Sequence, residues 1–157
     1  MKTLKEFVCN PLPTPNCHAS TILPLPDGTV VCAWFGGTKE GKTDVDIWYA
    51  RRDENGWSKP ASVCYNKHLP HWNPVLFLRE NGEVVLFFKV GREIPSWRTF
   101  ASVSTDGGKT FGKPCELVSG DKSGGRGPVK NKCIRLSDGR VLAPASSENR
   151  GWNCFID

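Results

Sequence analysis

Two histidines stand at positions from which each can move a proton. His18 and His71 each open a stretch that reads as a β-strand. Because the pKa of an imidazole lies near neutrality, either side chain is a candidate general acid or base. The alternative is a structural histidine whose ring satisfies hydrogen bonds at a strand edge. We therefore treat both as candidate catalytic residues and leave this alternative open.

Lys89 is a lysine at the end of an apolar strand. It follows five apolar residues, Val84 to Phe88. An ammonium at the end of a buried strand needs a partner or a water-filled cavity. A structural ion pair and the carboxylate of a ligand are both compatible with this position.

A glycine-rich basic segment is the third candidate element. Residues 124–132 read G-G-R-G-P-V-K-N-K, which resembles an anion-binding loop but lacks the strand and helix context of a phosphate loop. Arg126, Lys130 and Lys132 are therefore candidates for binding a carboxylate. A solvated basic loop is the alternative.

These candidates lie on a repeat that recurs along the chain. Predicted strands flank turns at Asp27-Gly28, Asn81-Gly82 and Asp138-Gly139, with offsets of 81 − 27 = 54 and 138 − 81 = 57 residues. A repeat of this size with four short strands is typical of propeller blades. The sequence thus predicts an all-β fold of successive antiparallel sheets with little or no helix. The predicted sheets cover residues 17–60, 71–117 and 129–157, and the third contains strands over 129–136, 140–145 and 152–157.

One turn of the repeat carries a fuller signature, S-T-D-G-G-K-T-F. Asp106 can accept hydrogen bonds from the backbone N–H groups that follow it, and Gly108 permits positive φ where the chain reverses. Ser104 and Thr110 can join the strand ends, and Phe111 can pack between sheets. An ordinary hairpin with a D-G-G turn is the alternative.

Composition limits the classes of protein. The 157 residues fit one domain, and no apolar run is long enough to span a membrane. The first residues lack the apolar core of a signal peptide, so we expect a cytoplasmic protein. Net charge is +5 with scattered basic residues, which argues against nucleic-acid binding and leaves an acidic glycan as a partner. Seven cysteines without a C-x-x-C pair predict no disulfide, metal or other cofactor.

The turn over residues 104–111 has the pattern of an Asp-box. Together with the other turns and the strand starts W-S-K-P and F-G-K-P, it resembles the sialidase superfamily of BNR or Asp-box β-propellers. The resemblance covers residues 17–157, after an N-terminal arm over residues 1–16. It implies about two and a half of the six blades of that family. We therefore expect the chain alone to be inactive, and either to self-associate or to depend on a missing C-terminal part.

The resemblance also implies a function, the processing of a terminal acidic sugar. The stretches F-G-G-T-K-E-G, H-W-N-P-V and G-G-R-G-P-V-K-N-K look most like bacterial and fungal members that act on acidic sugars other than sialic acid, lyases among them. Two reactions are expected: hydrolysis by an exo-glycosidase and β-elimination at a uronate. A non-catalytic glycan-binding propeller and an inactive fragment of a larger enzyme are the alternatives.

Family members place their active site on the propeller axis. By resemblance, His18 stands where the family has its first arginine, and Lys132 where it has a glutamate. Asp44 is the nearest match to the acid/base aspartate, and Asp46 the second. The predicted catalytic residues are thus His18, His71 and Asp44, and the predicted substrate-binding residues are Asn73, Lys89, Arg92, Arg126, Lys130 and Lys132. We expect Lys89, Arg126, Lys130 and Lys132 to point into one cavity with His18 or His71.

Overall fold

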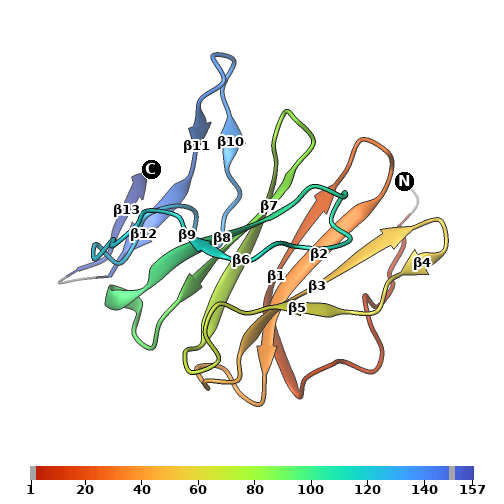
Figure 1. Ribbon diagram of the computed structural model, residues 1–157, viewed down its shortest axis with the longest axis horizontal. Helices are drawn as coiled ribbons and strands as arrows, with labels where there is room; N and C mark the ends of the chain where they lie inside the picture. Colours follow the sequence, from red (N-terminus) through yellow and green to blue (C-terminus); the bar gives the residue numbers. More distant parts are fainter. Residues whose placement is uncertain (1–2, 149–150) are drawn as a thin grey trace.

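The first two repeats each fold into an antiparallel sheet. The computed structural model describes residues 3–148 and 151–157. In the first sheet β1 (Asn16–Pro24), β2 (Val30–Gly37), β3 (Asp46–Asp53) and β4 (Gly56–Trp57) are neighbours in sequence order, and β5 (Ala61–Val63) also pairs with β3. In the second sheet β6 (His71–Leu78), β7 (Val84–Val90), β8 (Arg98–Ser104) and β9 (Cys115–Glu116) follow the same order, with a 3₁₀ turn, η1 (Ile94–Ser96), between β7 and β8. The predicted antiparallel sheets are confirmed here. Each of the three repeats is called a unit below, and Figure 1 shows the units side by side.

Glycine turns connect the first and second strands of each unit. Gly28, Gly82 and Gly139 have φ of 85°, 83° and 87°. This left-handed region is open to glycine, which has no Cβ. The Asp27 carboxylate accepts the N–H of Thr29 at 2.9 Å and so closes the first of these turns. The predicted turns are therefore present.

The Asp-box is a dense hydrogen-bonded turn after β8. Asp106 Oδ1 accepts from Ser104 Oγ at 2.7 Å, Lys109 N at 3.0 Å and Thr110 N at 2.9 Å, and Oδ2 accepts from Thr110 Oγ1 at 2.6 Å. Partial burial raises the pKa of Asp106, but these hydrogen bonds outweigh it and lower the pKa to about 2. A Cβ on Gly108 would overlap Val31 of β2, so the turn sits directly against the first sheet.

The core lies between the first two sheets, which pack face to face. Phe88 and Phe100 of the second sheet are fully buried, and their rings lie 6.2 Å apart. Burying one such side chain contributes roughly 1.5–3 kcal/mol. Phe111 of the Asp-box extends this core, since its ring meets Tyr49 edge-on at 4.8 Å. The first sheet contributes Val31, Ala33, Phe35, Ile47 and Tyr49, and the second contributes Leu76, Val84, Leu86, Phe88 and Phe100.

The third unit forms smaller sheets than the sequence predicted. β10 (Ile134–Arg135) pairs with β11 (Val141–Leu142), and β12 (Pro144–Ser147) pairs with β13 (Asn153–Ile156). The strand expected over 129–136 pairs as a strand only at its end, because Lys130 has a φ of 64°. The strand expected over 140–145 is divided at Ala143, next to Pro144, which has no N–H for a ladder.

The segment before β1 lies on the first sheet without forming a strand. No residue from 3 to 15 is in a strand, and Glu6 forms an ion pair with Arg52 of β3 at 2.6 Å.

In the described part of the chain no helix is long and apolar enough to cross a bilayer.

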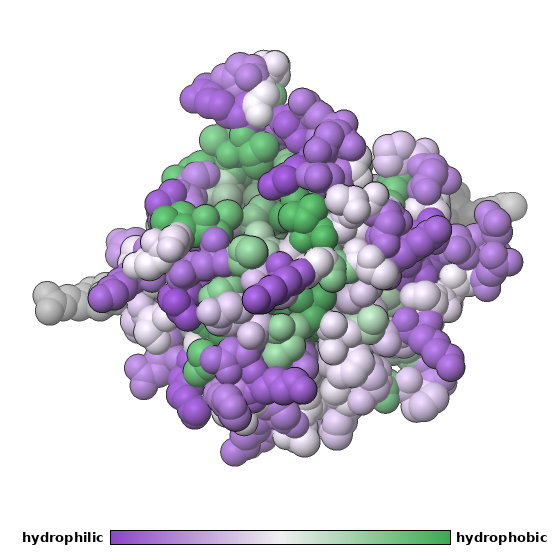
Figure 2. Space-filling model, in the orientation of Figure 1, coloured by the Kyte–Doolittle hydropathy of each residue, from purple (hydrophilic) through white to green (hydrophobic). Residues whose placement is uncertain are grey.

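The third unit also exposes apolar side chains. Trp152 is 86% exposed and Ile156 is 63% exposed. Figure 2 shows apolar atoms gathered in the middle and upper part of one face, bordered by polar atoms. Exposed apolar surface of this kind favours association, but self-association of the chain stays a prediction.

Candidate functional site

His18 lies on β1, opposite Phe35 of β2. Its exposed ring stacks on Phe35 with a centroid distance of 5.6 Å. The side chain lines a cavity of about 340 Å³ between β1, β2 and the N-terminal arm, and a smaller hollow that Glu40 also lines. His18 is therefore accessible, but among the first-sheet elements.

Asp44 lies in the loop between β2 and β3 and holds that loop closed. Its carboxylate accepts the N–H of Thr38 at 3.0 Å and the hydroxyl of Thr38 at 3.0 Å. The side chain is exposed. Its predicted role as an acid stays a prediction, since these hydrogen bonds account for its position.

His71 is fully buried at the start of β6. Its Nδ1 lies 2.9 Å from the carbonyl oxygen of Val45, and its Nε2 accepts the N–H of Tyr65 at 3.0 Å. A backbone N–H can only donate, so the ring is neutral with its proton on Nδ1. Burial lowers the pKa of His71, which favours this neutral form. The ring therefore bridges two connecting segments, as in the structural alternative.

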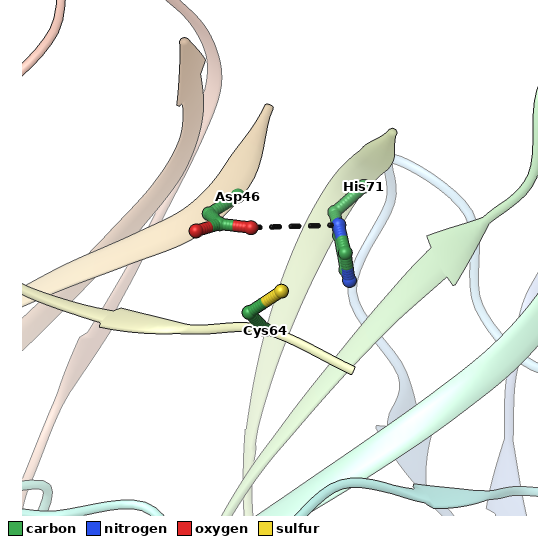
Figure 3. Close-up of side chains that lie close together, drawn as sticks. All are labelled: Asp46, Cys64 and His71. Atoms are coloured by element: carbon green, nitrogen blue, oxygen red, sulfur yellow. Dashed lines mark ion pairs between the residues drawn. The ribbon is translucent and has the colours of Figure 1, made fainter. Parts of the chain in front are cut away.

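Asp46, Cys64 and His71 form a cluster of groups that can bind metals. Figure 3 shows the three side chains pointing toward one another. One ligand atom from each lies within 4.8 Å of the others, and Asp46 Oδ1 is 3.8 Å from His71 Nδ1. Both nitrogens of His71 are engaged by backbone groups, however, so no nitrogen lone pair faces a metal. Burial and the Asp46 carboxylate raise the pKa of Cys64 to about 12, which also disfavours the thiolate that a metal or a nucleophile requires.

A cavity of about 500 Å³ lies between the second sheet and the third unit. Its volume is within the range of small-molecule sites. Asn73, Lys89 and Lys130 are the predicted residues that line it. Glu148 adds a carboxylate to the wall. The apolar part of the wall comes from Ile94, Trp97, Phe155 and Ile156.

Lys89 is 1% exposed, and its ammonium is fully engaged by neighbouring oxygens. Nζ donates to Thr99 Oγ1 at 2.7 Å, to the carbonyl oxygen of Arg126 at 2.7 Å and to that of Gly127 at 3.4 Å. Burial lowers the pKa of Lys89 to about 8, although the carboxylates of Asp121 and Asp157 act in the opposite direction. Lys89 therefore joins β7 to the glycine-rich loop, and no carboxylate of the described residues forms an ion pair with its ammonium.

Arg126 does bind a carboxylate, but that of the chain itself. Its Nε and Nη2 each lie 2.8 Å from Asp157 Oδ1, and Gly127 N donates to Asp157 Oδ2 at 2.6 Å. Hydrogen bonds from Arg126 are the largest cause of the lowered pKa of Asp157. The loop thus has the chemistry of an anion site, filled here by an aspartate.

The remaining predicted cations lie apart from the cavity. Lys132 Nζ donates to the carbonyl oxygen of Ile22, and Arg92 Nη2 donates to that of His68 at 3.3 Å. Neither these residues nor Arg126, His18 or His71 line the 500 Å³ cavity, so the structure gathers only part of the expected set. Lys130 differs from them, because its ammonium makes no hydrogen bond or ion pair with any residue that the structure describes.

Glu148 and Trp97 line the cavity but are not among the residues predicted for a site. Glu148 lies beyond the last recognisable turn of the sequence, and no motif marks it. Trp97 is 7% exposed. Trp97 directly follows η1 in the segment that connects β7 to β8, and this position in a connecting segment is the feature that could have indicated a site residue.

The family of the chain follows from its sequence. Residues 28–157 match the family described as BNR repeat-like domain, and the chain belongs to that family. No curated protein matches the chain.

Solved structures show the same fold at low sequence identity. A Hadza microbial sialidase is similar with a TM-score of 0.75 and 12% identity, over 91% of this chain and 35% of that one. A Dyadobacter fermentans protein of unknown function has a TM-score of 0.65 and 12% identity, over 90% of this chain and 51% of that one. An endo-arabinase from Bacteroides thetaiotaomicron has a TM-score of 0.62 and 12% identity, over 89% and 55%.

The chain therefore has part of a sialidase-like β-propeller fold and spans between 35% and 55% of these three structures. At such identities the likeness concerns the fold. The predicted superfamily and fold class are confirmed by the matched family and these neighbours. The roles of the individual site residues stay predictions.

Proposed function

We propose that this chain is part of a carbohydrate-active protein that binds a terminal acidic sugar of a glycan and processes it by hydrolysis or β-elimination. The observation that carries the proposal is the 500 Å³ cavity with Lys130 on its wall. Its partner would be an acidic oligosaccharide. A Penicillium chrysogenum α-L-arabinanase of similar fold was solved with arabinobiose, at a TM-score of 0.58 and 18% identity over 87% of this chain and 44% of that one.

The wall of the cavity has the mixed character that a sugar needs. Trp97 and Phe155 offer apolar surface for the C–H faces of a ring. Asn73 and Asn131 offer amide donors and acceptors for hydroxyl groups. Lys130 offers an ammonium that no residue among 3–148 and 151–157 occupies, which suits a carboxylate of the ligand.

The two proposed reactions require different residues. In β-elimination a base removes the proton beside the carboxylate, the C–O bond on the next carbon breaks, and the leaving oxygen takes up a proton. Lys130 would stabilise the charge that builds up on the carboxylate. The groups of the cavity that can transfer a proton are the carboxylate of Glu148 and the amine of Lys89. Burial lowers the pKa of Lys89 to about 8. In hydrolysis the family resemblance implies Asp44 as the acid, a residue of the loop between β2 and β3 that does not line this cavity.

A glycan-binding protein without catalysis is the second candidate. The favouring observation is that Lys89, His71 and Arg126 each form hydrogen bonds with other groups of the chain. A general base in that state must first give up a hydrogen bond. Binding through Lys130 and Asn73 needs no such change.

The test combines binding with product analysis on the purified chain. We expect methyl glucuronide to bind more tightly than methyl glucoside, and Lys130→Ala to remove most of that preference. Lys113→Ala is the matched control, because Lys113 is an exposed lysine away from the cavity. Acidic oligosaccharides are then incubated with the chain and assayed for free sialic acid, new reducing ends and unsaturated uronate absorbance. Equal affinity for both glycosides would refute the proposal. Product formed by the chain alone would exclude the second candidate and would contradict the expectation that the chain alone is inactive.

A further inference from the structure

Three residues share an unusual backbone conformation at the same place in each unit. Among residues 3–148 and 151–157, the non-glycine residues with positive φ are Ala19 (51°), Asn73 (45°) and Lys130 (64°). Each lies eight residues before the first residue of its turn, since 27 − 19 = 8, 81 − 73 = 8 and 138 − 130 = 8. The conformation therefore belongs to the repeat.

Each of these residues interrupts the first strand of its unit. The ladder of β1 with β2 shifts register between His18 and Thr21, and that of β6 with β7 shifts between Trp72 and Val75. In the third unit Val129 N donates to the carbonyl oxygen of Pro144 at 3.1 Å, and regular pairing resumes only at Ile134. A bulge of this kind re-aims the side chains around it.

Glycine is the residue that suits such a conformation best. A left-handed backbone is unfavourable for residues with a Cβ, although asparagine tolerates it better than most. The chain does use glycine at the nearby turns, where Gly28, Gly82 and Gly139 have positive φ. Side chains kept at strained positions often mark a ligand site.

Two of the three side chains meet in the 500 Å³ cavity. Asn73 and Lys130 both line it, from neighbouring units. Ala19 instead lines the cavity beside the N-terminal arm, and its methyl group has no polar chemistry. Ala19 thus has the same backbone conformation without the same surroundings.

We propose that Asn73 and Lys130 are the specificity-determining pair of this site, because the left-handed backbone that they share with Ala19 places both of their side chains on one cavity, where they contact one sugar. Lys130 takes the carboxylate, and the Asn73 amide takes hydroxyl oxygens of the same ring. The ligand is then an acidic monosaccharide unit that bridges the second and third units. This inference rests on the proposed function.

The test uses glycine variants, for which a structural and a functional role give different results. Lys130→Gly and Asn73→Gly remove the side chain and relieve the backbone. We expect the Tm of Lys130→Gly to rise by about 2–4 °C and that of Asn73→Gly to rise less. Affinity for methyl glucuronide should fall about tenfold or more for Lys130→Gly, the loss expected for one charge-assisted hydrogen bond. It should fall about threefold to tenfold for Asn73→Gly.

Ala19→Gly is the matched control, with the same backbone change outside the cavity. Its Tm should rise as well, while its affinity for methyl glucuronide stays at the wild-type value. Lys130→Arg should retain the preference for methyl glucuronide over methyl glucoside, and Lys130→Asn should lose it. These two variants keep the test decisive if a glycine variant folds poorly.

The outcomes separate the inference from the proposed function. The inference is overturned if the wild-type chain prefers methyl glucuronide while Asn73→Gly and Lys130→Gly both bind it as tightly as wild type. In that case the two side chains do not contact the ligand. If the wild-type chain does not distinguish the two glycosides, the proposed function and the inference fail together.

Discussion

Lys89 and Asp157 hold opposite sides of one peptide group. Lys89 Nζ donates to the carbonyl oxygen of Arg126 at 2.7 Å, and the N–H of Gly127 donates to Asp157 Oδ2 at 2.6 Å. The peptide between Arg126 and Gly127 thus lies between a buried ammonium and a carboxylate, which polarise it in the same direction. This contact fixes the glycine-rich loop that leads into Lys130 and the cavity.

The first prediction is that Lys89 stabilises the fold through this loop. Lys89→Met keeps most of the aliphatic side chain but removes the ammonium that donates to the carbonyl oxygens of Arg126 and Gly127, of which that of Arg126 still accepts from Thr99 Oγ1. We expect a loss of about 2–4 kcal/mol in the free energy of unfolding, measured by urea denaturation. Lys113→Met, on the surface, should change it by less than about 0.5 kcal/mol. Similar values for the two variants would show that the loop does not depend on Lys89.

The second prediction concerns pH and His71. Burial lowers the pKa of His71 in the folded chain, whereas the unfolded chain takes up a proton near pH 6.5. The unfolded state therefore binds more protons below that pH, so the stability contribution of His71 falls as the pH drops below about 6.5. We expect Tm to decrease between pH 7.5 and 5.5, and His71→Gln to flatten this decrease. A slope that persists in His71→Gln would assign it to other groups.

The third prediction concerns the Asp106 carboxylate. Asp106→Asn retains the shape of the side chain but replaces an acceptor oxygen with a donor, so part of the hydrogen-bond set of the Asp-box is lost. We expect a loss of about 1–3 kcal/mol in the free energy of unfolding. The pKa of Asp106 is lowered to about 2, so its carboxylate stabilises the fold above pH 4 and loses that effect as the pH falls toward 2. Asp106→Asn should lack this acid-dependent part, and an unchanged acid transition would contradict the prediction.

The fourth prediction compares two glycines of nearly equal φ. Gly108 (82°) and Gly28 (85°) both have a left-handed backbone, but a Cβ on Gly108 would overlap Val31 while a Cβ on Gly28 meets nothing within 4 Å. Gly28→Ala should cost about 1 kcal/mol from the backbone alone. Gly108→Ala should cost about 1–3 kcal/mol more, because it also overpacks the contact between the sheets. Equal melting temperatures would mean that the Asp-box turn does not pack on β2.

Local signals made most of the fold predictable from the sequence. The turns at Asp27, Asn81 and Asp138, the apolar strand before Lys89 and the Asp-box each depend on residues close together in the chain. The strands of the third unit were less predictable, because the left-handed Lys130 and the position of Pro144 interrupt runs that otherwise read as continuous strands.

The site was less predictable, because contacts between distant residues decide which side chains are free. Nothing near Arg126 in the sequence indicates that Asp157 would occupy its guanidinium. Nothing near His71 indicates that Val45 and Tyr65 would engage both ring nitrogens. The sequence identified Lys130 and Asn73 as candidates, but only the packing of two units shows that they share a cavity.

The most direct test is to locate the bound ligand, which we expect in the cavity between the second sheet and the third unit. Methyl glucuronide is titrated into the ¹⁵N-labelled chain, and the backbone amide shifts are followed by NMR. We predict that the largest changes occur around the 500 Å³ cavity, at Asn73, Gly124, Lys130, Asn131 and Ser146, and that methyl glucoside causes much smaller changes. No saturable shift, or shifts centred on His18 and the N-terminal arm, would contradict it.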